Sequence, residues 1–181
     1  MDTYKLKFTK LQNRIFRLLC IKAGASLNQR EIAKLLKVSP TAVNKALKAL
    51  EKTELITVKK IKTMNLKAVK LNRDNPRAIK LKRIENLSQI YEAKLDEYLE
   101  ERVPGCTIIL FGSYSLGEDT AESDIDIAVI GSSDKKVNTM QFESLLQRKI
   151  YLHCYKDFKS IHKNLKVNII NGITLGGAVE I

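Results

Sequence analysis

The sequence has few cysteines and no long apolar run, so neither a disulfide framework nor a membrane span is expected. It contains 3 cysteines, an odd number without a Cys-x-x-Cys pair. We expect Cys20, Cys106 and Cys154 to be buried, reduced thiols, because each lies among apolar or aromatic neighbours. No apolar run approaches the roughly 18 residues of a membrane helix, and no signal-peptide core follows Met1. A cytoplasmic protein without a membrane partner is therefore expected.

Histidine is also scarce, and neither His153 nor His162 belongs to a recognisable metal motif. Negative charge is scarce in one half of the chain only. Residues 1–84 carry 22 Lys/Arg against 5 Asp/Glu, a net charge of +17, whereas residues 85–181 carry 10 against 15, a net charge of −5. The basic half is typical of a polyanion binder, and the lack of a long apolar or strongly amphipathic anchor favours nucleic acid over membrane.

Three helices followed by a hairpin are predicted in the basic half. Ser26 or Asn28 can cap the second helix, and Ser39 can cap the third, with Pro40 at its first position. The expected bounds are 8–21, 29–36 and about 40–52 for the helices, and 56–61 and 66–71 for the two strands, with the turn at 62–65.

The third helix and the hairpin present a polar surface. The helix should bury a stripe made of Val43, Leu47 and Leu50. Its exposed face would then carry hydrogen-bond donors able to approach base edges, namely Thr41, Asn44, Lys45 and Lys48. The hairpin adds positive charge at Lys59, Lys60, Lys62, Lys67 and Lys70.

Three helices followed by a basic hairpin resemble the winged helix-turn-helix DNA-binding domains, over roughly residues 5–72. The resemblance implies that the third helix enters the major groove of double-stranded DNA and reads bases through Thr41, Asn44, Lys45 and Lys48. The wing lysines Lys59, Lys60, Lys62 and Lys67 would then hold phosphates. A protein-binding winged helix with a solvated lysine face is the alternative, but a net charge of +17 exceeds what solubility requires.

A long helix is predicted to follow, from Pro76 to about Arg102. Its apolar stripe recurs at three- and four-residue steps. The stripe consists of Ile84, Leu87, Tyr91, Leu95 and either Tyr98 or Leu99. Such a helix could pack on a C-terminal sheet, join two protomers in a homodimer, or do both.

Two short motifs in the acidic half carry the chemistry. Gly112 and Ser113 are followed, after ten residues, by Asp124-Ile125-Asp126; these two segments are called the paired motif below. Alternate side chains of a strand share a face, so Asp124 and Asp126 should point together while Ile125 and Ile127 face the core. Two such carboxylates suit Mg2+ or Mn2+, hard cations that also bind substrate phosphates.

The Gly-Ser half of the paired motif suits a phosphate. Gly112 lets the backbone approach a phosphate closely, and Ser113 adds a hydroxyl and an N–H at the start of a short helix. The expected elements of this half are strands 106–111, 124–130, 150–155 and 173–175, with helices near 137–148 and 156–170.

The paired motif and its flanking strands are similar to the DNA polymerase beta nucleotidyltransferase superfamily, and the small size resembles its minimal prokaryotic members. The resemblance implies transfer of a nucleoside monophosphate from a nucleoside triphosphate. Asp124 and Asp126 would be the catalytic metal ligands, and Gly112 and Ser113 would bind the nucleotide. The alternative is an Asp-Ile-Asp at a strand end beside an unrelated Gly-Ser turn.

Two departures from that family leave the activity open. Tyr151 falls where a third carboxylate is expected, and Leu116 stands where an arginine is frequent. His153 would share the face of Tyr151, either as a proton acceptor or as a hydrogen-bonded strand histidine.

Three functions therefore stay open. The first is a DNA-binding nucleotidyltransferase. The second is a transcriptional regulator whose degenerate transferase domain senses nucleotide or mediates oligomerisation, and the third is an antitoxin-like partner protein. The predicted fold class is α+β, with a winged helix-turn-helix domain at 1–72, a connecting helix at 73–103 and a small mixed-sheet nucleotidyltransferase domain at 104–181.

Overall fold

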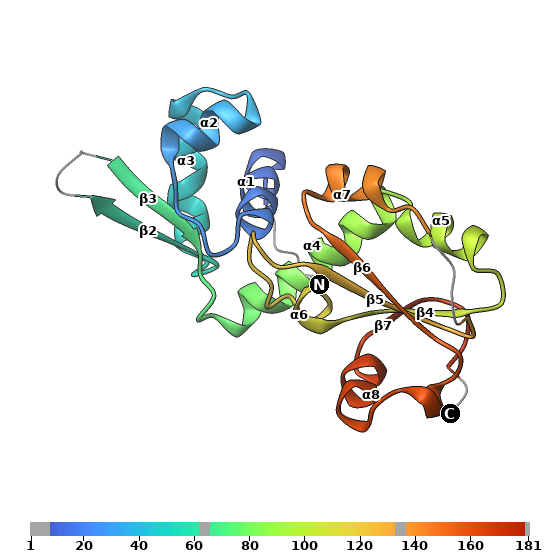
Figure 1. The fold of residues 1–181 in the computed structure, drawn as a ribbon. Helices are drawn as coiled ribbons and strands as arrows, with labels where there is room; N and C mark the ends of the chain where they lie inside the picture. Colours follow the sequence, from blue (N-terminus) through green and yellow to red (C-terminus); the bar gives the residue numbers. More distant parts are fainter. Residues whose placement is uncertain (1–7, 62–65, 133–136, 180–181) are drawn as a thin grey trace, which may run out of the picture. The chain divides into compact units, whose positions relative to one another are not determined.

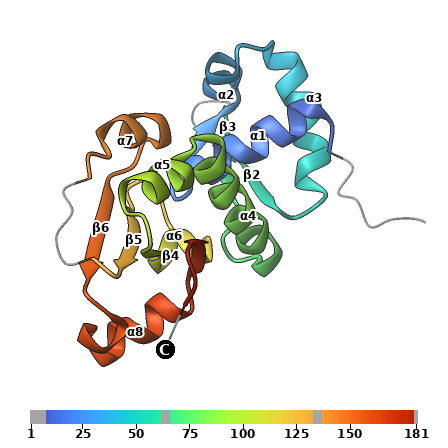
Figure 2. The same cartoon turned by 90° about the vertical axis from the view of Figure 1, so that its right-hand side faces the viewer.

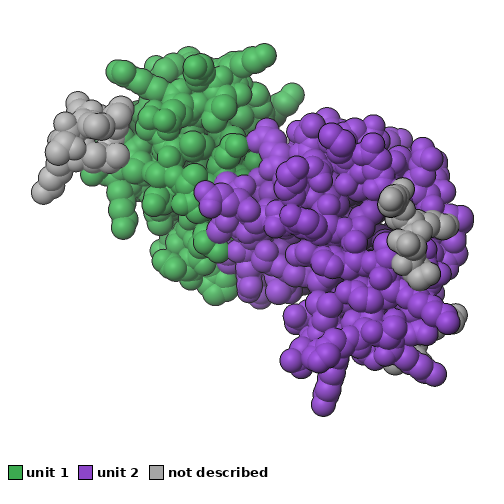
Figure 3. All heavy atoms as spheres, in the orientation of Figure 1, with its two compact units in different colours: residues 1–78 green, residues 79–181 purple. Residues whose placement is uncertain are grey.

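The chain folds around two small β-sheets, one in each of two units (Figure 3). The computed structural model describes residues 8–61, 66–132 and 137–179. The first unit is Met1–Ala78 and the second is Ile79–Ile181. Helices and two sheets confirm the α+β class, whereas the domain limits drawn at residues 72 and 103 stay a prediction.

The described residues of the first unit form helices α1 to α3 and an antiparallel sheet of strand order β1-β3-β2. Its elements are α1 (Lys10–Ile21), β1 (Leu27–Asn28), α2 (Gln29–Leu36), α3 (Pro40–Glu51), β2 (Ile56–Ile61) and β3 (Leu66–Leu71) (Figure 1). The predicted helices and the antiparallel pairing of the two hairpin strands are confirmed, whereas the predicted turn at 62–65 lies outside the described residues. Strand β1 was not predicted, because two residues are too short for an alternating pattern.

Side-chain caps fix where these helices begin. Helix α1 starts two residues later than predicted, because Thr9 is its cap and exchanges hydrogen bonds with Gln12. Asn28, one of the two expected candidates, caps α2 by accepting from two backbone N–H groups, while Glu31 accepts from the Asn28 N–H. Ser39 caps α3 by accepting from the Ala42 N–H, as predicted.

The second unit is built on a four-stranded sheet of order β6-β5-β4-β7, in which β5 and β6 are parallel and the other pairs antiparallel. Its strands are β4 (Thr107–Phe111), β5 (Ile125–Ile130), β6 (Ile150–Tyr155) and β7 (Ile173–Gly176). Its helices are α4 (Pro76–Glu92, whose first turn lies in the first unit), α5 (Leu95–Arg102), α6 (Gly112–Leu116), α7 (Met140–Leu146), the 3-10 turn η1 (Phe158–Ser160) and α8 (Lys163–Ile170).

Alternation along the strands divides the core of this unit into two layers. Ile125 and Ile127 are fully buried, as predicted, in the layer that includes residues of α4, α5 and α7. Ala128 and Ile130 point to the opposite face, where they pack with η1 and α8. Figures 1 and 2 show α8 on the other side of the sheet from α5 and α7. Asp126 shares the α8 face by the same alternation.

Two long helices predicted from the sequence are each interrupted. The helix expected over 76–102 is broken after Glu92, because Lys94 takes a left-handed backbone with φ 58°. The helix expected over 156–170 is wrong at its start, since Asp157 caps only the short turn η1 and Ile161 is extended. Neither interruption involves a proline or glycine, which are the usual sequence signals of a break.

The predicted apolar stripe of α4 is also wrong in part. Ile84 and Tyr91 are 62% and 44% exposed. The buried side of the helix instead carries Lys82, Asn86 and Ile90, at four-residue steps. Leu95 and Leu99 of α5 are buried, as predicted.

The prediction of buried cysteines is confirmed at two of three positions. Cys20 and Cys106 are buried and form no disulfide, whereas Cys154 is only half-buried. Within 8–61, 66–132 and 137–179, none of the helices combines the length and the apolar character that a bilayer span needs.

Candidate active site and nucleic-acid interface

The two halves of the paired motif meet where β4 ends. Phe111, the last residue of β4, pairs with Asp126 of β5 in the antiparallel register. Gly112 follows with φ +72°, and a Cβ atom at that position would lie 2.9 Å from Asp126 Oδ2. The missing side chain of Gly112 therefore lets the Asp126 carboxylate lie directly against the backbone at the start of α6.

The two aspartates differ in exposure. Asp126 is the second residue of β5 and is half-buried, whereas Asp124 precedes the strand and is exposed. The Ile125 N–H donates to the Lys149 carbonyl at 2.8 Å, so β5 is held by the β6 segment from its first residue. Ser113, in α6, is half-buried.

His153 contacts Asp126 directly. Its Nε2 lies 3.0 Å from Asp126 Oδ1, and its ring meets Phe111 edge-on, with centroids 5.3 Å apart. An ionised carboxylate only accepts hydrogen bonds, so Nε2 is the donor here. This arrangement favours the hydrogen-bonded strand histidine over a proton acceptor at that nitrogen.

Tyr151 occupies the register position beside Asp126. The parallel pairing of β5 with β6 aligns the two residues, and Tyr151 is 52% exposed. In the described parts of the chain, no group of three His, Cys, Asp or Glu side chains could hold a metal ion. The donors that Asp124 and Asp126 offer are all oxygens, the type of donor that Mg2+ and Mn2+ prefer.

Glu143 fixes the start of β6. Its carboxylate accepts from the Ile150 N–H at 3.2 Å and from Lys149 Nζ at 3.1 Å. These two contacts, the backbone one first, hold the pKa of Glu143 below its ordinary value. Glu143 is therefore expected to be ionised at neutral pH and to hold the end of the sheet that carries the paired motif.

The residues that sequence reasoning missed are buried and polar. Lys82, Asn86, Asp119 and Arg148 all belong to the second unit and are buried. In the sequence, Lys82 and Asn86 lie four residues apart and so on one face of α4. This spacing did not predict their burial, because it is equally typical of a solvated helix face.

The candidate DNA-contacting residues lie on α3, β2 and β3. Thr41, Lys45 and Lys48 are exposed on α3, and Lys59 and Lys60 are exposed on β2. Asn44 is half-buried and accepts a hydrogen bond from Lys67 Nζ of β3 at 3.1 Å. Lys62 lies outside the described residues. Contact of these residues with DNA stays a prediction.

The folds of the two units define a class of protein. The first unit has three helices and an antiparallel wing, and the second has a mixed sheet with the paired motif at its strand ends. The family model described as winged helix-turn-helix DNA-binding matches residues 18–57, and the one described as nucleotidyltransferase domain matches residues 92–174. The chain therefore carries a winged helix-turn-helix DNA-binding domain and a nucleotidyltransferase domain in one polypeptide, as the sequence predicted.

Several solved structures are similar to part of the chain. The zinc-responsive MarR family member ZitR of Lactococcus lactis is 29% identical, with TM-score 0.40, over 55% of this chain and 64% of its own. The adhesin competence repressor AdcR of Streptococcus pyogenes is 23% identical, with TM-score 0.42, over 52% of this chain and 67% of its own. A toxin-antitoxin structure with AMP-PNP is 30% identical, with TM-score 0.37, over 47% of this chain and 72% of its own.

The chain thus spans less than two thirds of the length of ZitR. Because all three TM-scores lie below 0.5, these likenesses carry no weight for function. No curated protein matches the chain.

Proposed function

We propose that this protein binds double-stranded DNA and transfers a nucleoside monophosphate from a nucleoside triphosphate to an acceptor hydroxyl, using Mg2+ or Mn2+. One observation carries the proposal. The Asp126 carboxylate lies against the backbone of Gly112, so a carboxylate and the start of α6 lie next to each other. A metal-bound triphosphate needs both kinds of group at one place.

Four residues of the paired motif have a proposed role. Asp124 and Asp126 would hold the cation, which when bound would supply positive charge to the triphosphate and to the leaving pyrophosphate. The Gly112 backbone and the Ser113 hydroxyl bind phosphate oxygens. In the transfer, the acceptor oxygen bonds to the α-phosphorus, the bond from that phosphorus to pyrophosphate breaks, and the hydroxyl proton passes to solvent.

His153 supports this site without taking the proton. Its Nε2–H donates to Asp126 Oδ1, which fixes the direction of that carboxylate. A hydrogen bond of this kind to a ligating carboxylate raises metal affinity, because the ligand is already oriented when the cation binds.

A regulator with a degenerate transferase domain is the second candidate, and Tyr151 favours it. A phenol stands beside Asp126 where the family resemblance calls for a carboxylate, and the site then lacks a third ligand. In this version the paired motif binds nucleotide without turnover and reports nucleotide supply to the DNA-binding domain. The antitoxin-like partner stays a prediction that rests on the resemblance alone.

The DNA-binding role rests on α3 and its positive charge. Lys45 and Lys48 are exposed on the helix that this class of domain places in the major groove. A homodimer is part of the proposal, since such domains commonly bind two half-sites and α4 leaves Ile84 and Tyr91 exposed. Sedimentation of the full chain with and without a DNA duplex measures this assembly.

Radiolabel transfer tests the enzymatic proposal. The full chain is incubated with each of the four α-labelled triphosphates, Mg2+ or Mn2+, and DNA, RNA or protein acceptors. Asp124→Asn and Asp126→Asn should abolish transfer, while Glu97→Gln, which removes an exposed carboxylate on α5, should not change it. Nucleotide binding without any transfer by the wild type would support the regulator instead.

A further inference from the structure

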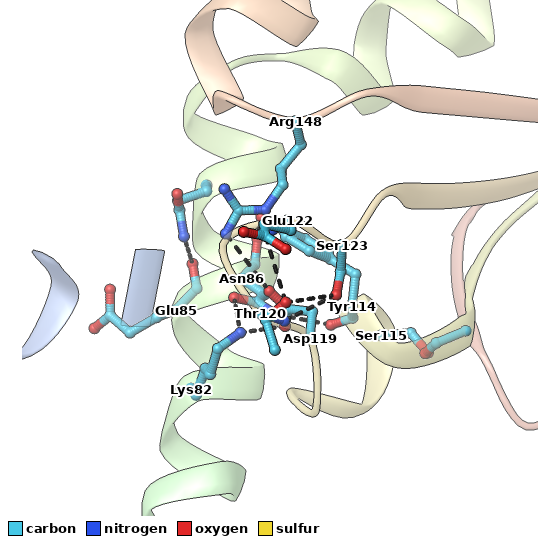
Figure 4. A network of polar contacts seen from close by, with 12 residues as sticks. Lys82, Glu85, Asn86, Tyr114, Ser115, Asp119, Thr120, Glu122, Ser123 and Arg148 are labelled. Atoms are coloured by element: carbon cyan, nitrogen blue, oxygen red, sulfur yellow. Dashed lines mark hydrogen bonds and ion pairs between the residues drawn. The ribbon is translucent and has the colours of Figure 1, made fainter. Parts of the chain in front are cut away.

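Helix α4 buries a lysine and an asparagine that contact the chain between the two halves of the paired motif. Lys82 is 0% exposed, and its Nζ forms an ion pair with Asp119 Oδ1 and a hydrogen bond of 3.2 Å to Asn86 Oδ1. On the other side of Asp119, Arg148 Nη2 lies 3.8 Å from Oδ2. Figure 4 shows Lys82 and Asn86 pointing from α4 toward Asp119, with Arg148 on the opposite side.

Asn86 bonds at two points of the segment that links the two halves of the motif. Its Nδ2 donates to the Tyr114 carbonyl at 2.8 Å and to Asp119 Oδ1 at 2.6 Å. Tyr114 directly follows Gly112 and Ser113, so this bond ties α4 to the phosphate half of the motif. Asp119 begins the segment that leads to Asp124, so the other bond ties α4 to the carboxylate half.

A short turn, formed by Thr120 and Ser123, connects Asp119 to Asp124. The Thr120 N–H donates to Ser123 Oγ at 2.9 Å, and the Ser123 N–H donates back to the Thr120 carbonyl at 3.2 Å. These two bonds leave few conformations for the residues between Asp119 and Asp124. A shift of Asp119 would therefore displace Asp124.

Burial makes this network costly unless every charge in it is paired. A buried ion pair adds little net stability compared with apolar side chains of the same volume. Apolar residues at positions 82 and 86 would pack α4 equally well, but they would not fix the direction of the Asp119 carboxylate or of the Tyr114 carbonyl. Direction is what a metal and phosphate site requires.

We propose that Lys82 and Asn86 are positioning residues for the nucleotidyl site. They act through Asp119 on Asp124, and through the Tyr114 carbonyl on Gly112 and Ser113. This inference rests on the proposed function of the paired motif, and it assigns a role to side chains that do not touch the nucleotide.

Two near-isosteric variants of the full chain test it. Lys82→Met removes the ammonium group and Asn86→Leu removes the amide, each with little change of volume. Gln89→Met is the matched control, because Gln89 is buried on the same helix and its side chain donates to the Glu85 carbonyl of that helix. Amide hydrogen exchange of residues 114–124 and Mn2+ affinity by electron paramagnetic resonance are both measured without nucleotide.

The expected result is specific to the two positions. Lys82→Met and Asn86→Leu should speed exchange in 114–124 and weaken Mn2+ binding by about 10- to 100-fold, the usual effect of losing an outer-shell partner. Gln89→Met should match the wild type. Ser123→Ala, at a half-buried position, removes a hydrogen bond of the turn without touching the ion pair and should weaken Mn2+ binding by about tenfold.

Two outcomes distinguish a failure of the positioning role from a failure of the proposed function. If wild-type exchange and Mn2+ affinity persist in folded Lys82→Met, Asn86→Leu and Ser123→Ala, the positioning role is refuted. If the wild type itself binds no Mn2+, the proposed function of the paired motif fails, whatever the exchange of 114–124 shows.

Discussion

Replacement of Gly112 by alanine should weaken metal binding at the paired motif and also lower the local stability of the fold. Gly112 has φ +72°, and its new Cβ would lie 2.9 Å from Asp126 Oδ2, closer than side chains tolerate. The left-handed backbone alone costs about 1–2 kcal/mol in a residue with a Cβ. The carboxylate must also turn away, which breaks its contact with His153 and costs about 1 kcal/mol more.

Gly105→Ala is the matched control for this change. Gly105 has φ +77° but no heavy atom within 4 Å of an added Cβ, so it carries only the backbone cost of about 1–2 kcal/mol. Local stability is read from hydrogen exchange of the β4 and β5 amides in the full chain. Gly112→Ala should be roughly 1 kcal/mol less stable than Gly105→Ala and should bind Mn2+ about tenfold more weakly. Equal Mn2+ affinity in the two variants would refute the reasoning.

Three further predictions concern the DNA surface and the start of β6. Lys48→Ala should lower the salt dependence of DNA binding by about 0.9 in the log–log slope, measured by fluorescence anisotropy, whereas Lys94→Ala on the second unit should leave the slope unchanged. Equal slopes for both variants would show that Lys48 of α3 does not contact DNA phosphates. Asn44→Ala and Lys67→Met should be non-additive in DNA affinity, with a coupling of roughly 0.5–1 kcal/mol because the two side chains are bonded at 3.1 Å; additive losses would show that the bond plays no part in binding. The pKa of Glu143 is lowered in the fold, so its contribution to stability is present above the ordinary value of 4.5 and lost as pH falls through the lowered pKa. Glu143→Gln should therefore weaken the pH dependence of the free energy of unfolding below pH 4.5. Identical pH profiles for variant and wild type would contradict this.

Local signals in the sequence were sufficient to predict most helices and strands of the first unit. Helix α2 and the strands of the hairpin have their predicted bounds, because helix caps and β-prone runs depend on residues that are adjacent in the sequence. The paired motif was equally visible, since its spacing and its flanking apolar runs are local. The buried state of Ile125 and Ile127 followed from strand alternation.

Long-range contacts decided what the sequence could not show. The bend at Lys94 has no glycine or proline to announce it, and the apolar pattern continues through it. Lys82 lies on the buried side of α4 because Asp119, 37 positions away, supplies its counter-charge. His153 meets Asp126 only because β5 and β6 pair in a register that no local pattern specifies. For these residues tertiary contacts override the helical and strand patterns.

Nucleotide transfer by the paired motif is tested with labelled triphosphate and Mg2+ or Mn2+, on the full chain of the wild type beside Asp126→Asn. The wild type should transfer label only when the cation is added, and Asp126→Asn should transfer none. A wild type that binds the metal-nucleotide measurably but transfers no label to any acceptor would show that the paired motif is not a transferase site.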